Sequence, residues 1–485
     1  MVTINSCLNV GFLVYKVEVQ ISMSRGYGVK IIGLTDRVVR ESKHRILTAL
    51  HFNSFKVSGQ RIIINLSPAD LPKTGMGFDL PIAIGILMAK KLIITALKPE
   101  RILFLSELTL NGDLKANQGY VNCVQKMIDS DFEFIVLAYQ ARDRCTHLNQ
   151  EKLVFCKNIN EVLRFLKTKK KENQVFCKPE FFIGAKTDLD FCQIINQEDA
   201  VNAAQVAVLG QHHLILKGNS GLGKSMIAER IPSIATRIDH IDKSEILGIY
   251  DLFNGIGFKE FDYTQIPFRR PDHNITRAGL KGSMYRKLIP GEASLAHGGV
   301  LFLDELNYFQ FDVLRLLQNV LDHRIIQLKK GNQNITLPAD FLCVTGFNVS
   351  EIDQYPKIIS PSLIERFDLC VYLNPIAIDH QKKLNKPLQH SKKMSEEINE
   401  ARKFQLSRNA KVGGGLNSRL NTQQTYEVCR KTRVAASLFQ EAVESNNWSF
   451  RRQLKVLQLA RSIADLKFVE QIDEYHLSKA ITWAP

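Results

Sequence analysis

One continuous stretch fits the GxxxxGK[ST] phosphate-binding loop at every fixed position: Gly218, Asn219, Ser220, Gly221, Leu222, Gly223, Lys224 and Ser225. Glycines let successive backbone N–H groups face an anion, Lys224 can neutralise the β- and γ-phosphates, and the Ser225 hydroxyl can bind Mg²⁺. The spacing therefore predicts that the chain binds ATP or GTP together with Mg²⁺. An ordinary glycine-rich turn is the alternative, but it would not require the lysine and the hydroxyl at these positions.

Two adjacent carboxylates, Asp304 and Glu305, directly follow the apolar run 299–303. If that run is a central parallel strand, both carboxylates reach the edge of the sheet at which α/β proteins bind phosphates. We expect Asp304 to bind Mg²⁺ together with Ser225, and Glu305 to polarise the attacking water. A core strand that leads into a capped helix would give the same pattern. The phosphate-binding loop upstream makes that alternative the weaker one. The apolar strand, Asp304 and Glu305 together favour an ATP-hydrolysing motor over a Ras-like switch.

Two further polar residues fit the same reaction. Asn348 follows another apolar run, 341–347, and could orient the attacking water or sense the γ-phosphate. Arg366 stands in the sequence Glu-Arg-Phe-Asp and could be an arginine finger that reaches the active site of a neighbouring subunit. Such a finger requires the chain to oligomerise. An arginine between acidic residues is also typical of a surface ion pair, so the assignment of Arg366 depends on its position after Asn348.

The elements that must position these residues can be inferred from the hydrophobic pattern. The runs 213–217, 299–303 and 341–347 are short and apolar, as expected for buried parallel strands, and residues 226–230 begin a helix. Strand, phosphate-binding loop and helix in that order are the context that the loop requires. The sequence therefore predicts an α/β core with a parallel sheet.

The order of these motifs resembles that of a known family. The segments that carry the resemblance are 31–34, 40–42, 64–73 and 78–81 near the N-terminus, and 218–225, 295–299, 303–305, 348, 365–368 and 460–466 further along the chain. Together they resemble the ComM (YifB) family of magnesium-chelatase-like AAA+ ATPases, and the resemblance covers nearly the whole chain.

This resemblance implies a multidomain α/β fold with a Lon-protease-like α+β domain at the N-terminus, a P-loop AAA+ core with a parallel sheet, and a C-terminal helical lid. It also implies an ATP- and Mg²⁺-dependent ring, a hexamer, that acts as a DNA helicase and promotes branch migration during natural transformation and homologous recombination. In such a protein Arg451 would be the lid arginine that contacts the γ-phosphate. Without the resemblance, Arg451 is an exposed basic residue on an amphipathic helix.

Composition and the resemblance together suggest the domain boundaries. We expect an N-terminal domain at 1–165, a charged linker at 166–188, the ATPase core at 189–376, a polar linker at 377–398 and the helical lid at 399–485. The two linkers are assigned from their polar, lysine-rich sequences.

Two basic segments are candidates for contact with DNA. The candidate residues are Arg269, Arg270, Arg277 and Lys281 in a first segment, and Lys329 and Lys330 in a second. The first segment contains glycine and proline and is interpreted as a loop near the pore of a ring, and the second is the tip of a predicted hairpin over 325–337. Such side chains would bind phosphates without reading bases, so binding would be independent of sequence and strongly salt-dependent. A solvated hairpin with a charged tip is an equally good interpretation.

The composition favours a cytoplasmic protein with a polyanionic partner. No apolar run in the 485 residues is long enough to span a membrane, and the N-terminus lacks the pattern of a signal peptide. Nine cysteines without a CxxC pair suit reduced thiols better than disulfides or a zinc site. The net charge of +15 favours a polyanion, although a lysine-rich proteome would give the same excess.

Other functions remain open at this point. A chaperone of the magnesium-chelatase or MoxR kind would use the same ATP site to remodel a protein or a metallocofactor, and a nucleotide-gated scaffold would hydrolyse ATP slowly or not at all. A Ser–Lys peptidase is not expected, because the loop 73–79 of the Lon-like domain contains no serine.

Overall fold

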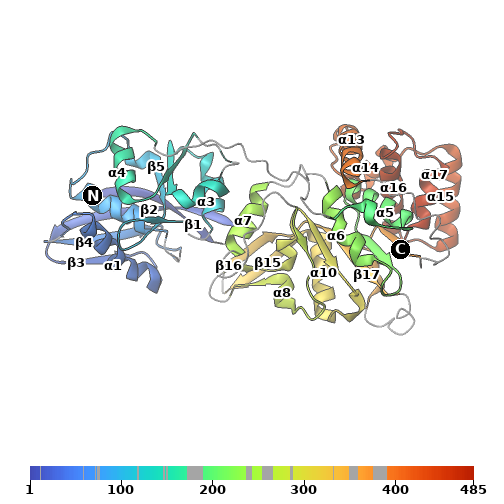
Figure 1. Cartoon of the computed structure of the whole chain (residues 1–485), viewed down its shortest axis with the longest axis horizontal. Coiled ribbons are helices and arrows are strands. Elements are labelled where there is room, and N and C mark those ends of the chain that lie inside the picture. Colours follow the sequence, from blue (N-terminus) through green and yellow to red (C-terminus); the bar gives the residue numbers. More distant parts are fainter. Residues whose placement is uncertain are drawn as a thin grey trace. The chain divides into compact units, whose positions relative to one another are not determined.

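The computed structural model describes the chain except for residues 11, 58, 72, 74–76, 117–118, 146–147, 149–150, 172–188, 236–242, 254–265, 285–287, 331–332, 349–358 and 375–389. The chain divides into two compact units (Figure 1). Unit 1 contains residues 1–180, 242–261 and 331–336, and unit 2 contains residues 181–241, 262–330 and 337–485. Each unit has its own cluster of buried apolar side chains.

Unit 1 is built on a mixed sheet. In spatial order its strands are β3 (Gly28–Ile32), β4 (Gln60–Ser67), β2 (Leu13–Arg25), β1 (Val2–Val10), β5 (Ile102–Leu105), β8 (Phe134–Ala138) and β9 (Leu153–Cys156). β1 and β2 form an antiparallel hairpin, whereas β5, β8 and β9 run parallel to β1. β6 (Glu107–Leu108) and β7 (Leu114–Lys115) form a small separate pair. This combination confirms the α+β fold expected for the N-terminal part.

Helices complete unit 1. They are α1 (Arg37–Phe52), α2 (Asp79–Ala89), α3 (Tyr120–Ile128), α4 (Ile159–Thr168) and α7 (Lys243–Phe253). α2 is apolar on all sides and almost entirely buried, as expected for a helix in the centre of a core. α7 belongs to the segment expected as the ATPase core, but it packs on α3, where Asp251 accepts a hydrogen bond from the backbone N–H of Val121 at 3.1 Å.

Unit 2 contains the predicted parallel sheet. In spatial order its strands are β11 (Phe268–Arg269), β14 (Val300–Leu303), β17 (Leu342–Phe347), β10 (Leu214–Lys217) and β18 (Leu369–Tyr372). Every neighbouring pair is parallel, and β14, β17 and β10 consist almost entirely of buried apolar residues. Such strands need helices on both faces of the sheet, which explains their continuous apolar runs.

The predicted hairpin is also present. β15 (Ile325–Lys330) pairs with β16 (Gln333–Pro338), and β12 (Gly282–Ser283) pairs with β13 (Ile289–Pro290). The helices of unit 2 outside the C-terminal region are α5 (Glu198–Gly210), α6 (Lys224–Ile234), α8 (Arg277–Lys281), α9 (Glu292–Leu295), α10 (Phe311–His323) and α12 (Pro361–Ile364).

The C-terminal region is helical and gathers in one bundle, shown in orange and red in Figure 1. Its helices are α13 (Ser391–Ala410), α14 (Thr422–Val428), α15 (Arg433–Asn446), α16 (Phe450–Asp465) and α17 (Glu474–Thr482). α13 begins inside the segment expected as the second linker, so residues 391–398 are helical. The boundary within 172–188 lies outside the described residues.

A buried polar network holds this bundle together. Asp465, which is fully buried, accepts hydrogen bonds from Arg461 at 3.1 Å and from Asn417 at 2.9 Å, and it pairs with Arg408. Buried charges of this kind persist only when each is paired. None of the described helices is both long and apolar enough to cross a membrane.

Candidate nucleotide-binding site

The phosphate-binding loop connects β10 to α6. Gly221 and Gly223 adopt φ angles of 82° and 93°, a left-handed conformation that a side chain would strain. Gly223 caps α6, so the unpaired N–H groups of the first helical turn are directed toward the loop. Lys224 is buried and donates from Nζ to the carbonyl oxygens of Gly218 at 2.7 Å and Asn219 at 3.0 Å. The Lys224 ammonium group therefore lies within the turn of the loop, where an anion-binding loop needs a positive charge.

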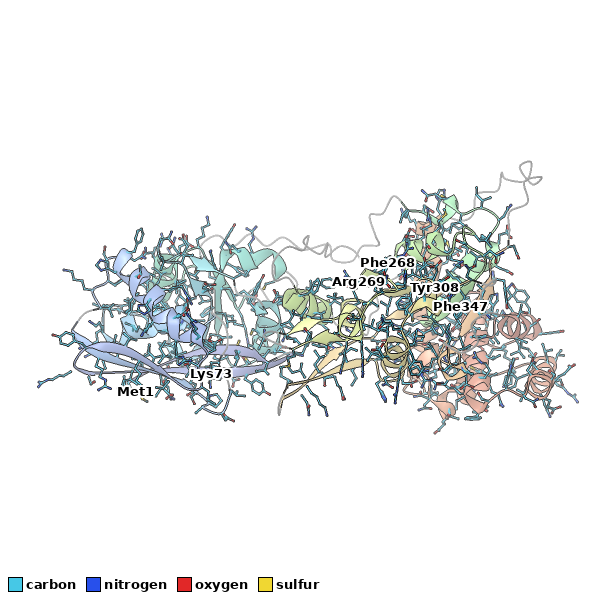
Figure 2. The ribbon with its side chains drawn as sticks, turned by 90° about the horizontal axis from the view of Figure 1, so that it is seen from below. Met1, Lys73, Phe268, Arg269, Tyr308 and Phe347 are labelled. Atoms are coloured by element: carbon cyan, nitrogen blue, oxygen red, sulfur yellow. The ribbon has the colours of Figure 1, made fainter. Side chains whose placement is uncertain are left out.

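The parallel sheet brings the other predicted residues to this loop. Parallel strands end at one edge of the sheet, and Asp304 and Glu305 follow β14 there, while Asn348 follows β17, the strand between β14 and β10. Ser225 Oγ donates to Asp304 Oδ2 at 2.7 Å. A hydroxyl and a carboxylate oxygen in contact are ligands that Mg²⁺ prefers, so the residues present fit this ion. Figure 2 labels Phe347, the last residue of β17, and Tyr308, shortly after β14.

The backbone at Glu305 is strained. This residue has φ 52° and ψ 57°, the left-handed region that non-glycine residues rarely adopt, and it begins the 3-10 helix η4 (Leu306–Tyr308). Such a conformation costs about 1–3 kcal/mol and persists only where the surrounding structure enforces it, most often at functional sites. It turns the chain immediately after Asp304.

Gly346 is a site residue that the sequence analysis did not identify. A Cβ atom on Gly346 would lie 2.7 Å from Asp304 Oδ1 and 3.5 Å from Lys224 Cε. A real Cβ atom essentially never approaches an oxygen to 2.7 Å, so any side chain here would displace the Asp304 carboxylate. A glycine inside an apolar strand pattern often marks such a close approach, and this was the available signal.

Arg270 also lies at this site, while the position of its segment near a pore stays a prediction. Its Nη2 lies 2.8 Å from Asp304 Oδ2 and 3.5 Å from Ser225 Oγ, and its Nη1 lies 2.8 Å from Glu229 Oε1. The preceding Arg269 pairs with both carboxylate oxygens of Glu292, at 2.6 Å each. Both arginines are therefore held by carboxylates of their own chain. No sequence signal predicts this, because it depends on the pairing of β11 with β14.

Arg366 and Arg451, predicted to contact nucleotide from two different elements, share one carboxylate. Arg366 Nε lies 2.9 Å from Asp322 Oδ2, and Arg451 Nη2 lies 2.9 Å from Asp322 Oδ1. Partial burial acts to raise the pKa of Asp322, but the hydrogen bonds from the two guanidinium groups outweigh it and lower the pKa below the usual value. Arg452, the next residue of α16, is buried and donates to the carbonyl oxygen of Phe367 at 3.2 Å.

These two arginines lie far from the phosphate-binding loop of their own chain. Arg366 precedes β18, whereas the loop follows β10, and these neighbouring strands are parallel with Leu214 opposite Leu369. Arg366 therefore lies at the sheet edge formed by the amino ends of the strands, and the loop lies at the opposite edge, formed by their carboxyl ends. The strands between the two edges are about 13 Å long. Because Arg451 binds the same aspartate as Arg366, it lies at the amino-end edge too. Neither can reach a nucleotide held by its own loop in this arrangement.

Three of the DNA-contact candidates from the two separate segments line one cavity. Arg277, Lys281 and Lys329 surround a hollow of about 600 Å³, together with Ser283 and Gln327. Arg277 and Lys281 are the first and last residues of the short helix α8, so this part of the segment is helical rather than a loop. Lys330 ends β15, and its side chain lies outside the described structure. The fold therefore combines basic groups that are about fifty residues apart in the sequence.

Unit 1 contains a buried lysine in the loop considered for peptidase activity. Lys73, labelled in Figure 2, lies in unit 1. It is fully buried, and its Nζ has no hydrogen-bond partner among the described residues. Desolvation lowers the pKa of this ammonium group, and Asp70 opposes the effect. Residues 74–76 of the loop lie outside the described part of the chain, so the expectation that the loop is not a peptidase site stays a prediction.

Comparison with known proteins identifies the family. A family model described as magnesium chelatase, subunit ChlI, matches residues 190–357, and models of other parts of this subunit match residues 17–141 and 388–483. Competence protein ComM of Haemophilus influenzae is 30% identical, and the similarity covers 96% of this chain and 94% of that protein. This chain belongs to the ComM family of magnesium-chelatase-like AAA+ proteins. YifB of Escherichia coli is 29% identical with the same coverage.

Membership in the ComM family confirms the resemblance inferred from the sequence motifs. The family model of the ATPase part spans the phosphate-binding loop, both carboxylates and Asn348, and the C-terminal model spans Arg451. The mixed α/β architecture, with its parallel sheet and C-terminal helices, agrees with a magnesium-chelatase-like AAA+ protein. ATP and Mg²⁺ are the ligands that this family membership implies.

Proposed function

We propose that this ComM-family protein is a cytoplasmic, ATP-hydrolysing ring motor that acts on DNA. Its role would be that of a helicase that promotes branch migration during natural transformation and homologous recombination. The observation that carries the proposal is the convergence of Lys224, Ser225, Asp304, Glu305 and Asn348 at one edge of a parallel sheet. The likeness to a protein named for competence supports a role in DNA uptake.

The residues at the sheet edge divide the hydrolytic reaction among them. Bound Mg²⁺ supplies positive charge for the β- and γ-phosphates. Ser225 and Asp304 hold the ion, while Lys224 neutralises phosphate charge from the loop. Glu305 accepts the proton of the attacking water, and Asn348 orients that water. The strained backbone of Glu305 fixes the position of its carboxylate relative to Asp304.

The position of the arginines supports a ring. Arg366 and Arg451 lie together at the edge of the sheet opposite their own loop, and this is the edge from which a subunit could reach the nucleotide of a neighbour. In the single chain, Asp322 pairs with both arginines. We infer that the two act on the same neighbouring site, and that they exchange Asp322 for phosphate oxygens when subunits assemble, by family likeness as a hexamer.

DNA is the proposed substrate because of the basic cavity. Arg277, Lys281 and Lys329 present three positive charges around one hollow, and none of the described residues that line it is acidic. This is a suitable surface for a phosphate backbone, because its three positive charges attract phosphates whatever the base. Binding should therefore be independent of sequence.

The test is ATP hydrolysis by the purified protein without DNA, with single-stranded DNA and with a four-way junction, using Lys224→Ala as the blank. We expect hydrolysis to rise in the presence of DNA. When ATP is present, we also expect branch migration to separate the four-way junction into duplex products without cleavage of the strands. Hydrolysis that no DNA alters would contradict a DNA motor.

The second candidate is a remodelling chaperone that acts on a protein or a metallocofactor. The specific observation in its favour is that the three matching family models describe a subunit of magnesium chelatase. DNA-independent hydrolysis that rises with a polypeptide partner would favour this function.

A further inference from the structure

Arg270 contacts both residues that would hold Mg²⁺. Its Nη2 lies 2.8 Å from Asp304 Oδ2 and 3.5 Å from Ser225 Oγ. Its other terminal nitrogen, Nη1, lies 2.8 Å from Glu229 Oε1, and its guanidinium carbon lies 5.4 Å from the centre of the Phe302 ring. One guanidinium group thus lies where a metal ion bound by Asp304 and Ser225 would lie.

The sheet explains why this arginine reaches the site. β11 pairs with β14 in parallel, with Phe268 opposite Val300 and Arg269 opposite Leu301. Arg270 therefore leaves β11 at the same sheet edge at which Asp304 leaves β14. The bidentate pair of Arg269 with Glu292 anchors the strand from which Arg270 extends.

A guanidinium group and Mg²⁺ cannot both use this position. The contacted oxygen of Asp304 already accepts hydrogen bonds from Arg270 and Ser225. Mg²⁺ requires close, nearly octahedral oxygen ligands at 2.0–2.1 Å, and two cations at one carboxylate oxygen repel each other strongly. The arginine must move before the ion can bind. Glu229 is available as its partner after that movement, because it contacts the other nitrogen.

We propose that Arg270 competes with Mg²⁺ for Asp304 and thereby sets the Mg²⁺ concentration at which the nucleotide site is loaded. Arg270 withdraws toward Glu229 when the ion binds. In the absence of the ion it keeps the Asp304 carboxylate paired and in place. This inference rests on the ATP site of the proposed function, but it does not require that the protein acts on DNA.

The test is the binding of a fluorescent ADP analogue to the full-length protein, titrated with free Mg²⁺ in the absence of DNA. Arg270→Gln should lower the Mg²⁺ concentration at half-saturation on the order of tenfold, because one repelling charge is removed from Asp304. Arg270→Lys, which keeps the charge, should stay close to the wild type. The matched control is Arg433→Gln, which removes an exposed arginine of α15 and should change nothing.

The outcomes separate this inference from the ATPase proposal. A wild type that binds the analogue, with Arg270→Gln requiring as much Mg²⁺ or more, would overturn the competition alone. A wild type that binds no nucleotide at any Mg²⁺ concentration would overturn both. Folding of each variant is checked by its thermal unfolding midpoint. Arg270→Met, which also removes the charge but keeps a long side chain, should show the same fall in the required Mg²⁺ concentration and replaces Arg270→Gln if that variant is unstable.

Discussion

At the scale of single residues, the nucleotide site depends as much on a missing side chain as on the charged ones. Because Gly346 has no side chain, Asp304 and Lys224 can both lie close to it on β17. The Asp304 carboxylate also accepts hydrogen bonds from Arg270 and Ser225. Asp304 is therefore contacted from two sides, although its side chain is still 22% exposed. A small change in this surrounding should act directly on Mg²⁺ binding.

Gly346→Ala should lower ATP hydrolysis at least tenfold, because the new methyl group would lie 2.7 Å from Asp304 Oδ1 and would displace it. The measurement is steady-state hydrolysis over a range of Mg²⁺ concentrations. Gly415→Ala is the matched control, since a Cβ there meets nothing within 4 Å, and it should be silent. A Gly346→Ala enzyme with wild-type rates would show that the site is less tightly packed than described.

At the scale of elements, the lid helix α16 is fastened to the segment before β18. Lys455 Nζ lies 2.9 Å from Asp368 and donates to the carbonyl oxygen of Arg366, and Ser449 donates to Glu365 at 3.1 Å. With Asp322 between Arg366 and Arg451, these contacts join α10, α16 and the Arg366 segment. The two arginines are therefore expected to move together, as one surface offered to a neighbour.

This arrangement predicts complementation between inactive variants. Arg366→Ala and Glu305→Gln should each lower hydrolysis a hundredfold or more, since an arginine finger contributes about 10³–10⁵ in related enzymes. Mixing the two proteins should restore part of the wild-type rate, because some interfaces then combine an intact Glu305 with an intact Arg366. The measurement is hydrolysis as a function of the mixing ratio.

A protein that carries both substitutions is the control. When it is mixed with either single variant, the rate of hydrolysis should not exceed the rate of that single variant alone. Absence of any recovery in the original mixture would contradict a shared site and leave Arg366 as an ion-pair partner of Asp322.

The basic cavity between α8 and β15 gives a second prediction at this scale. Lys281→Ala with Lys329→Ala should weaken DNA binding and lower the slope of log K against log salt by about two, in accordance with two lost phosphate contacts. Fluorescence anisotropy at several salt concentrations measures it. The control pair, Lys403→Ala with Lys411→Ala, removes two exposed lysines elsewhere in unit 2. Equal slopes for both pairs would place the DNA contact outside the cavity.

At the scale of the whole molecule, the helical lid and the parallel sheet fold as one compact unit, unit 2. His212, in the segment between α5 and β10, is fully buried and contacts the lid. Its Nε2 lies 2.7 Å from Ser462 Oγ on α16. Burial lowers the pKa of this imidazole to about 4, so the folded protein keeps it neutral. The stability of this unit is therefore coupled to pH through an interior side chain.

Unit 2 should lose stability as the pH falls from about 6.5 toward 4. In this range His212 binds a proton in the unfolded chain but stays neutral in the folded chain. The contribution of His212 is complete above pH 6.5 and decreases by up to about 3 kcal/mol across this range. His212→Gln, which can still hydrogen-bond Ser462, should show a smaller fall in unfolding midpoint between pH 7 and pH 5 than the wild type. Identical pH dependence of the two proteins would contradict this role.

The sequence by itself determined the order of the motifs and was sufficient to predict their chemistry. The phosphate-binding loop, the Asp304–Glu305 pair and Asn348 are local patterns of residue type next to short apolar runs, and such runs have few alternatives to buried parallel strands. The hairpin over β15 and β16 was predicted for the same reason, since two alternating arms around a polar tip are sufficient. The family likeness then gave the α/β architecture that the structure confirms.

Only the tertiary structure decided which basic residues serve which site. Arg269 and Arg270 were grouped with Arg277 and Lys281 as candidates for DNA contact, but the pairing of β11 with β14 brings Arg270 to 2.8 Å from Asp304, a contact that the sequence did not predict. Likewise, only the parallel alignment of β18 with β10 shows that Arg366 is at the wrong edge to reach its own loop. These relations join strands that are distant in the sequence, and no local pattern of residues contains them because strand order is set by how the whole core packs.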